Sequence, residues 1–118
     1  MNNINLILKQ ISEVQNSSYL ILRTEILEHE KTFFKARLYI KKELYIQVYR
    51  NDKYRTTNFV LVLYGERIYG RDELRGKWHR HPENDPQTHD TTPAGTIPSN
   101  FKDFFEEIKP IIHKMKLL

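Results

Sequence analysis

Three of the five histidines gather in one segment, which runs from Trp78 to Asp90. His79 and His81 are two positions apart, so on an extended chain their side chains project to the same side. Imidazole titrates near neutral pH, so two histidines can act as general base and general acid in phosphodiester cleavage without a metal. We therefore expect His81 and His89 to exchange protons in a ribonuclease-type reaction, with His79 assisting.

Positively charged and aromatic side chains accompany these histidines. A cation beside the reacting phosphate would stabilise the charge that develops in the transition state, and Arg80 stands between His79 and His81. We assign Arg80 to the catalytic group and expect either Arg80 or Arg75 to hold the phosphate. Trp78 would anchor the segment to the sheet. The candidate substrate-binding residues are Arg71, Arg75, Lys77 and Trp78.

The same side chains offer a second kind of chemistry. Imidazole and carboxylate groups are ligands for zinc, iron, nickel and manganese. The alternative to metal-free catalysis is therefore a metal-dependent hydrolase with a divalent ion at His79, His81, His89 and Asp90. In a third interpretation, the segment is a solvated loop whose histidines have no chemical task.

Tyrosines alternate with basic residues elsewhere in the chain, for example Tyr39, Tyr45 and Tyr49 with Lys35 and Arg37. Aromatic rings and cations on an exposed sheet face can bind single-stranded nucleic acid by stacking and by phosphate contact. A net charge of +4 also favours encounter with anionic partners. A non-catalytic module that binds RNA or a protein partner is therefore the alternative function, although a half-exposed sheet also uses tyrosine for its strand propensity.

The composition is that of one folded domain. The chain has 118 residues, of which 39% are hydrophobic and 29% charged, as is usual for a globular domain with its own core. The absence of cysteine excludes disulfides and thiolate chemistry and fits the cytoplasm. No apolar run approaches the roughly 18 residues of a membrane span, and the N-terminal segment does not read as a signal peptide. We expect one cytoplasmic domain, residues 1–118, without membrane contact.

The periodicity of the apolar residues predicts the elements that position the histidines. A 3.6-residue period predicts a helix over 3–15. A period of two then predicts strands joined by short turns, and such turns require antiparallel pairing of neighbours, that is, a meander. The strand at 56–64 is apolar on both faces and should be the most buried. The predicted strands are 19–28, 32–40, 44–50, 56–64 and 68–72.

A second amphipathic helix is predicted from Asn100 to about Lys116, and Pro110 inside it predicts a kink or a break. The fold class is therefore α+β: an N-terminal helix, an antiparallel β-meander of about five strands, and a C-terminal helix packed on one sheet face. The stretch 75–98 is predicted to be a long loop, and loops of this length are usually either functional or disordered. The last strand, 68–72, would be an exposed edge available to pair with a second copy as a homodimer.

The order of these elements and several short motifs match a known pattern. The motifs are His81-Pro82, the Pro86-x-x-His89 spacing, and Thr96-Ile97-Pro98-Ser99 before the last helix. With this layout the chain resembles the TumE-like toxins of prokaryotic toxin–antitoxin pairs, over most of its length in layout and over about 78–100 in motif. The resemblance implies a toxin that inhibits growth by cleaving nucleic acid, with RNA as the expected target and a cognate antitoxin protein as partner. Trp78-His79-Arg80 stands where the family has Asp-Asn, and His89-Asp90 where it has a second histidine pair.

Overall fold

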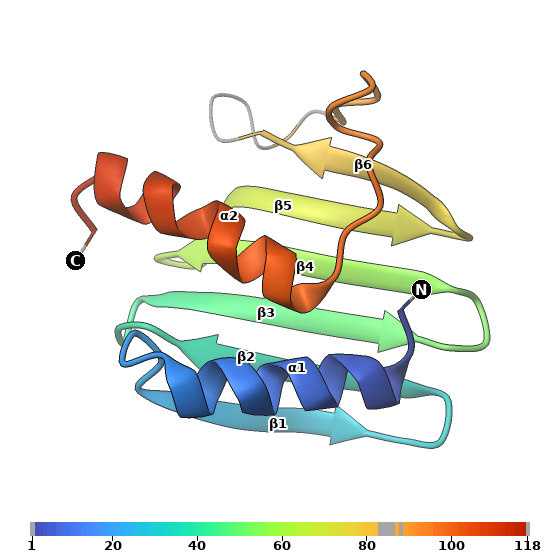
Figure 1. Cartoon of the computed structure of the whole chain (residues 1–118), viewed down its shortest axis with the longest axis horizontal. Helices are drawn as coiled ribbons and strands as arrows, with labels where there is room; N and C mark the ends of the chain where they lie inside the picture. The colour runs from blue at the N-terminus through green and yellow to red at the C-terminus, as the bar shows by residue number, and fades with distance from the viewer. Residues whose placement is uncertain (1, 83–86, 88, 118) are drawn as a thin grey trace.

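The computed structural model is an α+β fold of two helices and one sheet (Figure 1). The structure describes residues 2–82, 87 and 89–117. The elements in chain order are α1 (Ile4–Ser17), β1 (Arg23–His29), β2 (Phe33–Tyr39), β3 (Leu44–Asn51), β4 (Thr56–Leu63), β5 (Glu66–Leu74), β6 (Lys77–His81) and α2 (Phe101–Lys114).

The sheet is an antiparallel meander, as predicted, but it has six strands where the sequence predicted about five. The additional strand is β6, within the stretch predicted to be a loop. Arg75 and Gly76 adopt φ values of 53° and 84°, and Leu74 pairs with Lys77 across them. A two-residue turn with positive φ at both positions matches the twist of a hairpin. The edge expected at 68–72 is consequently paired on both sides, and β6 lies at the margin of the sheet instead.

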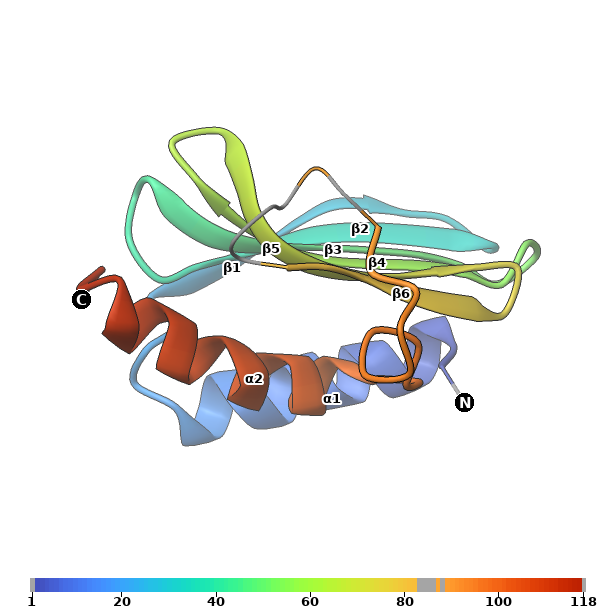
Figure 2. The same ribbon diagram turned by 90° about the horizontal axis from the view of Figure 1, so that it is seen from above.

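Both helices cover the same face of the sheet, and none of the described helices covers the other (Figure 2). The core lies between these two layers because the strands alternate buried and half-buried residues. β4 is the exception predicted from its sequence, since Phe59, Val60, Leu61 and Val62 are all at most 7% exposed. Each helix contributes an apolar stripe, and burying one large side chain stabilises the fold by about 1.5–3 kcal/mol.

Side-chain caps fix where the two helices begin. The Asn3 side-chain oxygen accepts a hydrogen bond from the Leu6 amide at 2.8 Å, and the Asn100 oxygen accepts one from the Asp103 amide at 2.9 Å. Such caps satisfy backbone donors that the first turn leaves without helical partners. α2 then continues through the exposed Pro110 as far as Lys114, so the break considered at this proline is not present.

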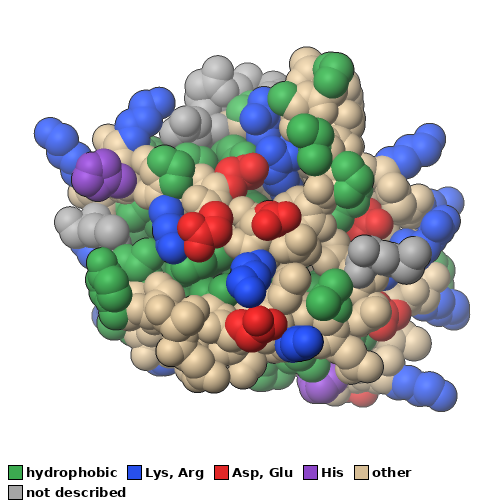
Figure 3. Space-filling model, in the orientation of Figure 1, with side chains coloured by type: hydrophobic (Ala, Val, Ile, Leu, Met, Phe, Trp, Pro, Cys, Tyr) green, Lys and Arg blue, Asp and Glu red, His purple; other side chains and the backbone are tan. Residues whose placement is uncertain are grey.

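A partly buried ion pair joins α2 to the sheet. Glu107 of α2 accepts hydrogen bonds from Arg71 of β5 at 2.6 and 2.9 Å and also from the Tyr69 hydroxyl. Burial and the contact with Glu107 raise the pKa of Tyr69. Figure 3 shows the face that carries the helices, with lysine and arginine side chains projecting around its rim. In the described part of the chain, neither helix has the length and apolar character needed to cross a bilayer.

Candidate functional site

The alternation of β6 divides its side chains between the two sheet faces. Trp78 is 8% exposed and packs against Phe59, with 6.2 Å between ring centroids, on the face that the helices cover. Because side chains alternate along a strand, His79 and His81 point to the other, helix-free face. Their shared direction was predicted from the His-x-His spacing, and β6 provides the extended backbone that it requires.

His89 joins this pair through a short bridge at the edge of β6. The Asp90 amide donates to the Arg80 carbonyl at 2.6 Å, and the Arg80 amide donates to the Asp90 carbonyl at 3.2 Å. Continuing this antiparallel register places His89 opposite His81 on the helix-free face. The His89 ring lies 4.6 Å from that of His81 and 4.4 Å from that of His79, with which it stacks at an interplanar angle of 8°.

Asp72 of β5 supplies a carboxylate to the two strand histidines. It pairs with His79 across the β5–β6 ladder, and its Oδ2 atom lies 2.9 Å from His81 Nε2 and 3.6 Å from His79 Nε2. An ionised carboxylate only accepts hydrogen bonds, so in that state Asp72 accepts a hydrogen bond from the Nε2–H group of His81. The other oxygen, Oδ1, is buried and has no hydrogen-bond partner among the described residues.

Gly70 lies opposite His81 and close to the backbone of β4. It pairs with His81, and a β-carbon at this position would lie 3.1 Å from the Phe59 carbonyl oxygen and 3.8 Å from the His81 β-carbon. The first distance is tight and the second is an ordinary contact. A side chain at position 70 would therefore press on the backbone of β4, beside His81, which is 3% exposed.

The three imidazoles form a group that could hold a metal ion. One ring nitrogen from each of His79, His81 and His89 lies within 4.8 Å of the others. Burial and the neighbouring His89 and His81 rings lower the pKa of His79, against an opposing contribution from Asp72. A lowered pKa keeps imidazole neutral to lower pH, and neutral imidazole is the form that binds metal.

Asp90, considered above as a fourth ligand, is engaged elsewhere. Its carboxylate accepts hydrogen bonds from Thr92 and from Arg80, whose Nε atom lies 2.9 Å from Asp90 Oδ2. These contacts, with those to Thr92 the larger, lower the pKa of Asp90 to about 2. The group of potential metal ligands therefore consists of the three histidines and does not include Asp90.

A cavity of about 600 Å³ adjoins the cluster and is large enough for a small ligand. His79 and His89 form part of its wall, together with Lys77 and Trp78. The remaining lining residues are Leu74, Gly76, Thr91, Thr96 and Pro98.

The structure separates the other predicted site residues. Lys77 and Trp78 line the cavity, and Arg75 is exposed in the turn before β6. Arg71 is 6% exposed and bound to Glu107 on the helix-covered side, so it does not face the cluster. The Arg80 guanidinium is paired with Asp90. Pro86, which belongs to one of the motifs above, lies outside the described residues.

Asp72 is the site residue that the sequence interpretation missed. The signal for it is the Arg75-Gly76 dipeptide, whose residues can form a two-residue hairpin turn. Counting outward from that turn pairs Leu74 with Lys77 and then Asp72 with His79.

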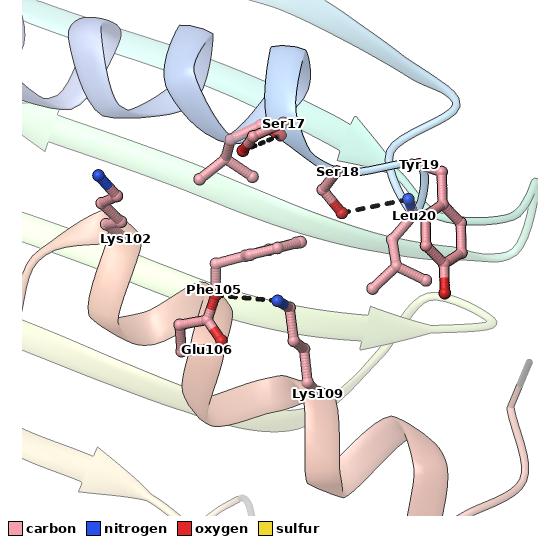
Figure 4. A pocket seen from close by; sticks show the side chains of 9 residues that line it. Ser17, Ser18, Tyr19, Leu20, Lys102, Phe105, Glu106 and Lys109 are labelled. Carbon is pink, nitrogen blue, oxygen red and sulfur yellow. Dashed lines mark hydrogen bonds and ion pairs between the residues drawn. The ribbon is translucent and has the colours of Figure 1, made fainter.

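A second hollow, of about 250 Å³, lies between the end of α1 and α2 (Figure 4). Its lining contains the Glu106–Lys109 ion pair, at 2.9 Å, and hydroxyl and apolar side chains, but none of the histidines. The cluster on the helix-free face therefore concentrates the groups that can ligate a metal or transfer protons near neutral pH.

Comparison with known protein-family models, curated proteins and solved structures gives no match for this chain. The function is therefore inferred from the geometry of the histidine cluster.

Proposed function

We propose that this chain is a metal-dependent hydrolase that cleaves RNA, with a divalent ion held by His79, His81 and His89. The observation that carries the proposal is the convergence of three ligand nitrogens within 4.8 Å. Three imidazoles suit zinc best among the biological cations and leave a coordination position for water or substrate.

The contact between Asp72 and His81 supports this assignment. Histidine ligands commonly donate their second ring N–H to a carboxylate, which orients the ring and makes it a better ligand. With Nε2 of His81 bonded to Asp72 at 2.9 Å, Nδ1 is the nitrogen that would coordinate the ion. Asp72 thus takes the position of an outer carboxylate beside the partly buried cluster, and it also lies 3.7 Å from the Arg67 guanidinium.

The spacing of the rings favours a metal over a pair of proton-transferring histidines. Ligands of one ion must converge on a single point, and one ring nitrogen from each of the three histidines lies within 4.8 Å of the others. A base and an acid for metal-free cleavage would use two of these rings, whereas an ion uses all three. Metal-free cleavage by His81 and His89 is the second candidate, and the Asp72–His81 hydrogen bond favours it because a carboxylate orients a general base in the same way.

A divalent ion held by His79, His81 and His89 would activate water for attack near neutral pH and would offset negative charge on the phosphate. The residues of the chain then have separate tasks in the proposed reaction. Asp72 orients His81, and burial lowers the pKa of His79, which favours its neutral form. Lys77, in the wall of the adjoining cavity, attracts the phosphate of the substrate.

The proposed biological setting is the one implied by the family resemblance. RNA cleavage would stop growth of the cell, and a cognate antitoxin protein would bind the chain and neutralise it in the cytoplasm. Substitution of a cluster histidine should then abolish growth inhibition.

The test uses a fluorescent single-stranded RNA and the purified protein after chelation, with and without added zinc or manganese. We expect cleavage to require the added ion, and His89→Ala to reduce the rate by about 100-fold or more. His89 is exposed, so its substitution should leave the circular dichroism spectrum unchanged. His113→Ala, which removes an exposed histidine in the last turn of α2, is the matched control.

The possible outcomes separate the two candidates. Metal-independent cleavage that His81→Ala and His89→Ala both abolish would support the proton-transfer mechanism. Full activity and full growth inhibition in His89→Ala would contradict both mechanisms.

A further inference from the structure

The helix-free face carries four aromatic rings on the neighbouring strands β2 and β3. Phe33 lies 6.5 Å from Tyr49, and Tyr39 lies 5.3 Å from Tyr45, measured between ring centroids. All four are half-buried, while the residues that alternate with them are buried under the helices. Half-exposed rings on an uncovered sheet offer flat surfaces for stacking.

Cations stand beside these rings. The Arg37 guanidinium lies 4.7 Å from the Tyr45 ring centroid, and that of Arg23 lies 4.0 Å from the Tyr39 centroid. Lys35 occupies the same face between Phe33 and Arg37. Stacking on tyrosine holds an arginine side chain flat against the sheet while it keeps its charge.

This part of the face is complementary in charge to a polyanion. On the helix-free side of the described strands β2, β3 and β4, the alternating residues include two cations and no carboxylate. The acidic residues of this face lie on the flanking strands: Glu25 and Glu28 of β1 pair across the ladder with Arg37 and Lys35, and Asp72 of β5 contacts the histidines. The alternating residues are Phe33, Lys35, Arg37, Tyr39, Tyr45, Gln47, Tyr49, Asn51, Thr56, Asn58, Val60 and Val62.

The strand register connects these residues directly to the histidine cluster. One row of paired residues crosses the sheet from Lys35 through Tyr49, Asn58 and Asp72 to His79. With about 4.8 Å between neighbouring strands, Tyr49 and His79 are roughly 14 Å apart across the sheet.

A second row of the same face ends at the other strand histidine. It runs from Arg37 through Gln47, Val60 and Gly70 to His81. A chain laid along either row therefore reaches the cluster within a few nucleotides.

We propose that the helix-free face of β2 and β3 binds single-stranded RNA and leads it to the histidine cluster. Bases stack on Tyr45 and Tyr49, and phosphates contact Lys35 and Arg37. The proposed ligand is single-stranded, because the bases of a duplex are stacked on one another and cannot stack on protein rings. The cleavage of the bound strand rests on the proposed function, whereas the binding does not.

The experiment measures fluorescence anisotropy of a labelled single-stranded RNA with the full chain in the presence of a chelator, so that metal-dependent cleavage does not interfere. We expect Tyr45→Ser and Tyr49→Ser each to weaken binding by about 5- to 100-fold. Arg37→Gln should lower the slope of log affinity against log salt by about one. Tyr19→Ser, at a tyrosine that is 92% exposed outside this face, is the control and should bind as the wild type does.

Two results would overturn the inference. One is wild-type affinity in both Tyr45→Ser and Tyr49→Ser, with thermal unfolding showing that the variants are folded. The other is equal affinity for a duplex of the same sequence, which would mean that the bases are not used. Binding is measured without cleavage, so a negative binding result does not contradict metal-dependent cleavage. A negative cleavage result likewise does not contradict RNA binding by this face.

Discussion

At the scale of single residues, the chemistry of the cluster depends on a carboxylate that is not a candidate ligand itself. Asp72 contacts His81 at 2.9 Å and His79 at 3.6 Å from one oxygen atom. It therefore orients the His81 ring by a hydrogen bond and lies within ion-pair distance of the His79 ring. A carboxylate in this place also lowers the electrostatic cost of bringing a cation beside partly buried side chains.

Asp72→Asn tests this role, because the amide keeps the size of the side chain and removes its charge. We expect the affinity for zinc to fall by about 10- to 100-fold, measured by competition with a chromophoric chelator. Asp103→Asn on the first turn of α2, where the residue is exposed, is the matched control. Unchanged zinc affinity in Asp72→Asn would show that the contact with His81 does not support metal binding.

At the scale of elements, α2 keeps its length in spite of a proline. The helix runs from Phe101 to Lys114, and its buried face includes Phe104, Phe105 and Ile108 before Pro110 and Ile111 and Ile112 after it. Proline in a helix interior costs about 3 kcal/mol because one backbone hydrogen bond is lost and the ring crowds the preceding turn. Apolar burial on both sides of the proline offsets that cost, since each large side chain contributes about 1.5–3 kcal/mol.

Pro110→Ala should therefore stabilise the protein. Position 110 is exposed, so alanine meets no steric obstacle and restores a donor to the Glu106 carbonyl. We expect the free energy of unfolding to rise by about 1–3 kcal/mol, measured by urea denaturation. Lys109→Ala, at the adjacent position of the helix, gives the reference for a neighbouring alanine substitution. A loss of stability in Pro110→Ala would show that the helix needs the proline's local geometry.

The elements differ in how far the sequence determines them. The period of two between residues 32 and 64 predicts β2, β3 and β4 because each of these strands buries one face under the helices. The apolar period does not predict β6, because Trp78 is its one buried hydrophobic residue and the alternate positions hold His79 and His81. This strand is defined by pairing with β5 through the turn at Arg75 and Gly76, and only weakly by its own composition.

At the scale of the whole molecule, the two layers are joined by a buried polar contact as well as by apolar packing. Arg71 is 6% exposed and bound to Glu107, which also accepts from the Tyr69 hydroxyl. Removing one partner from such a network leaves a buried charge without compensation. The contact therefore fixes the position of α2 over β5 and, through the β5–β6 ladder, supports the strand that carries His79 and His81.

This network makes the stability of the domain sensitive to alkaline pH. Burial raises the pKa of Tyr69, whereas a tyrosine of the unfolded chain ionises near 10. The folded state therefore holds the Tyr69 proton more tightly than the unfolded state does. The contribution of this group to the free energy of unfolding is complete below about pH 10 and is lost as the pH rises further. We expect the wild type to lose more unfolding free energy between pH 9 and pH 11 than Tyr69→Phe, in urea titrations with Tyr64→Phe as control. Equal losses in the two would exclude Tyr69 as the source.

The site itself was predictable in part. The shared direction of His79 and His81 follows from their spacing, because it requires only an extended backbone. His89 reaches the cluster through the bridge between Arg80 and Asp90, and no local sequence pattern specifies that bridge. Asp72 reaches it through the register of the β5–β6 hairpin, which was not predicted from the sequence. Contacts between distant positions are set by tertiary pairing, so local periodicity does not determine them.

The meander also determines the order in which a newly made chain can fold on the ribosome. Every strand pairs with its immediate neighbour in the sequence, so hairpins can form one after another as the chain emerges, with low contact order. The helical layer closes late, because the Asn2 side chain reaches the Ser99 carbonyl across 97 positions and α2 begins at Phe101. A nascent chain that lacks α2 exposes part of the apolar side of its sheet, and exposed apolar surface of this kind favours aggregation until the helix is in place.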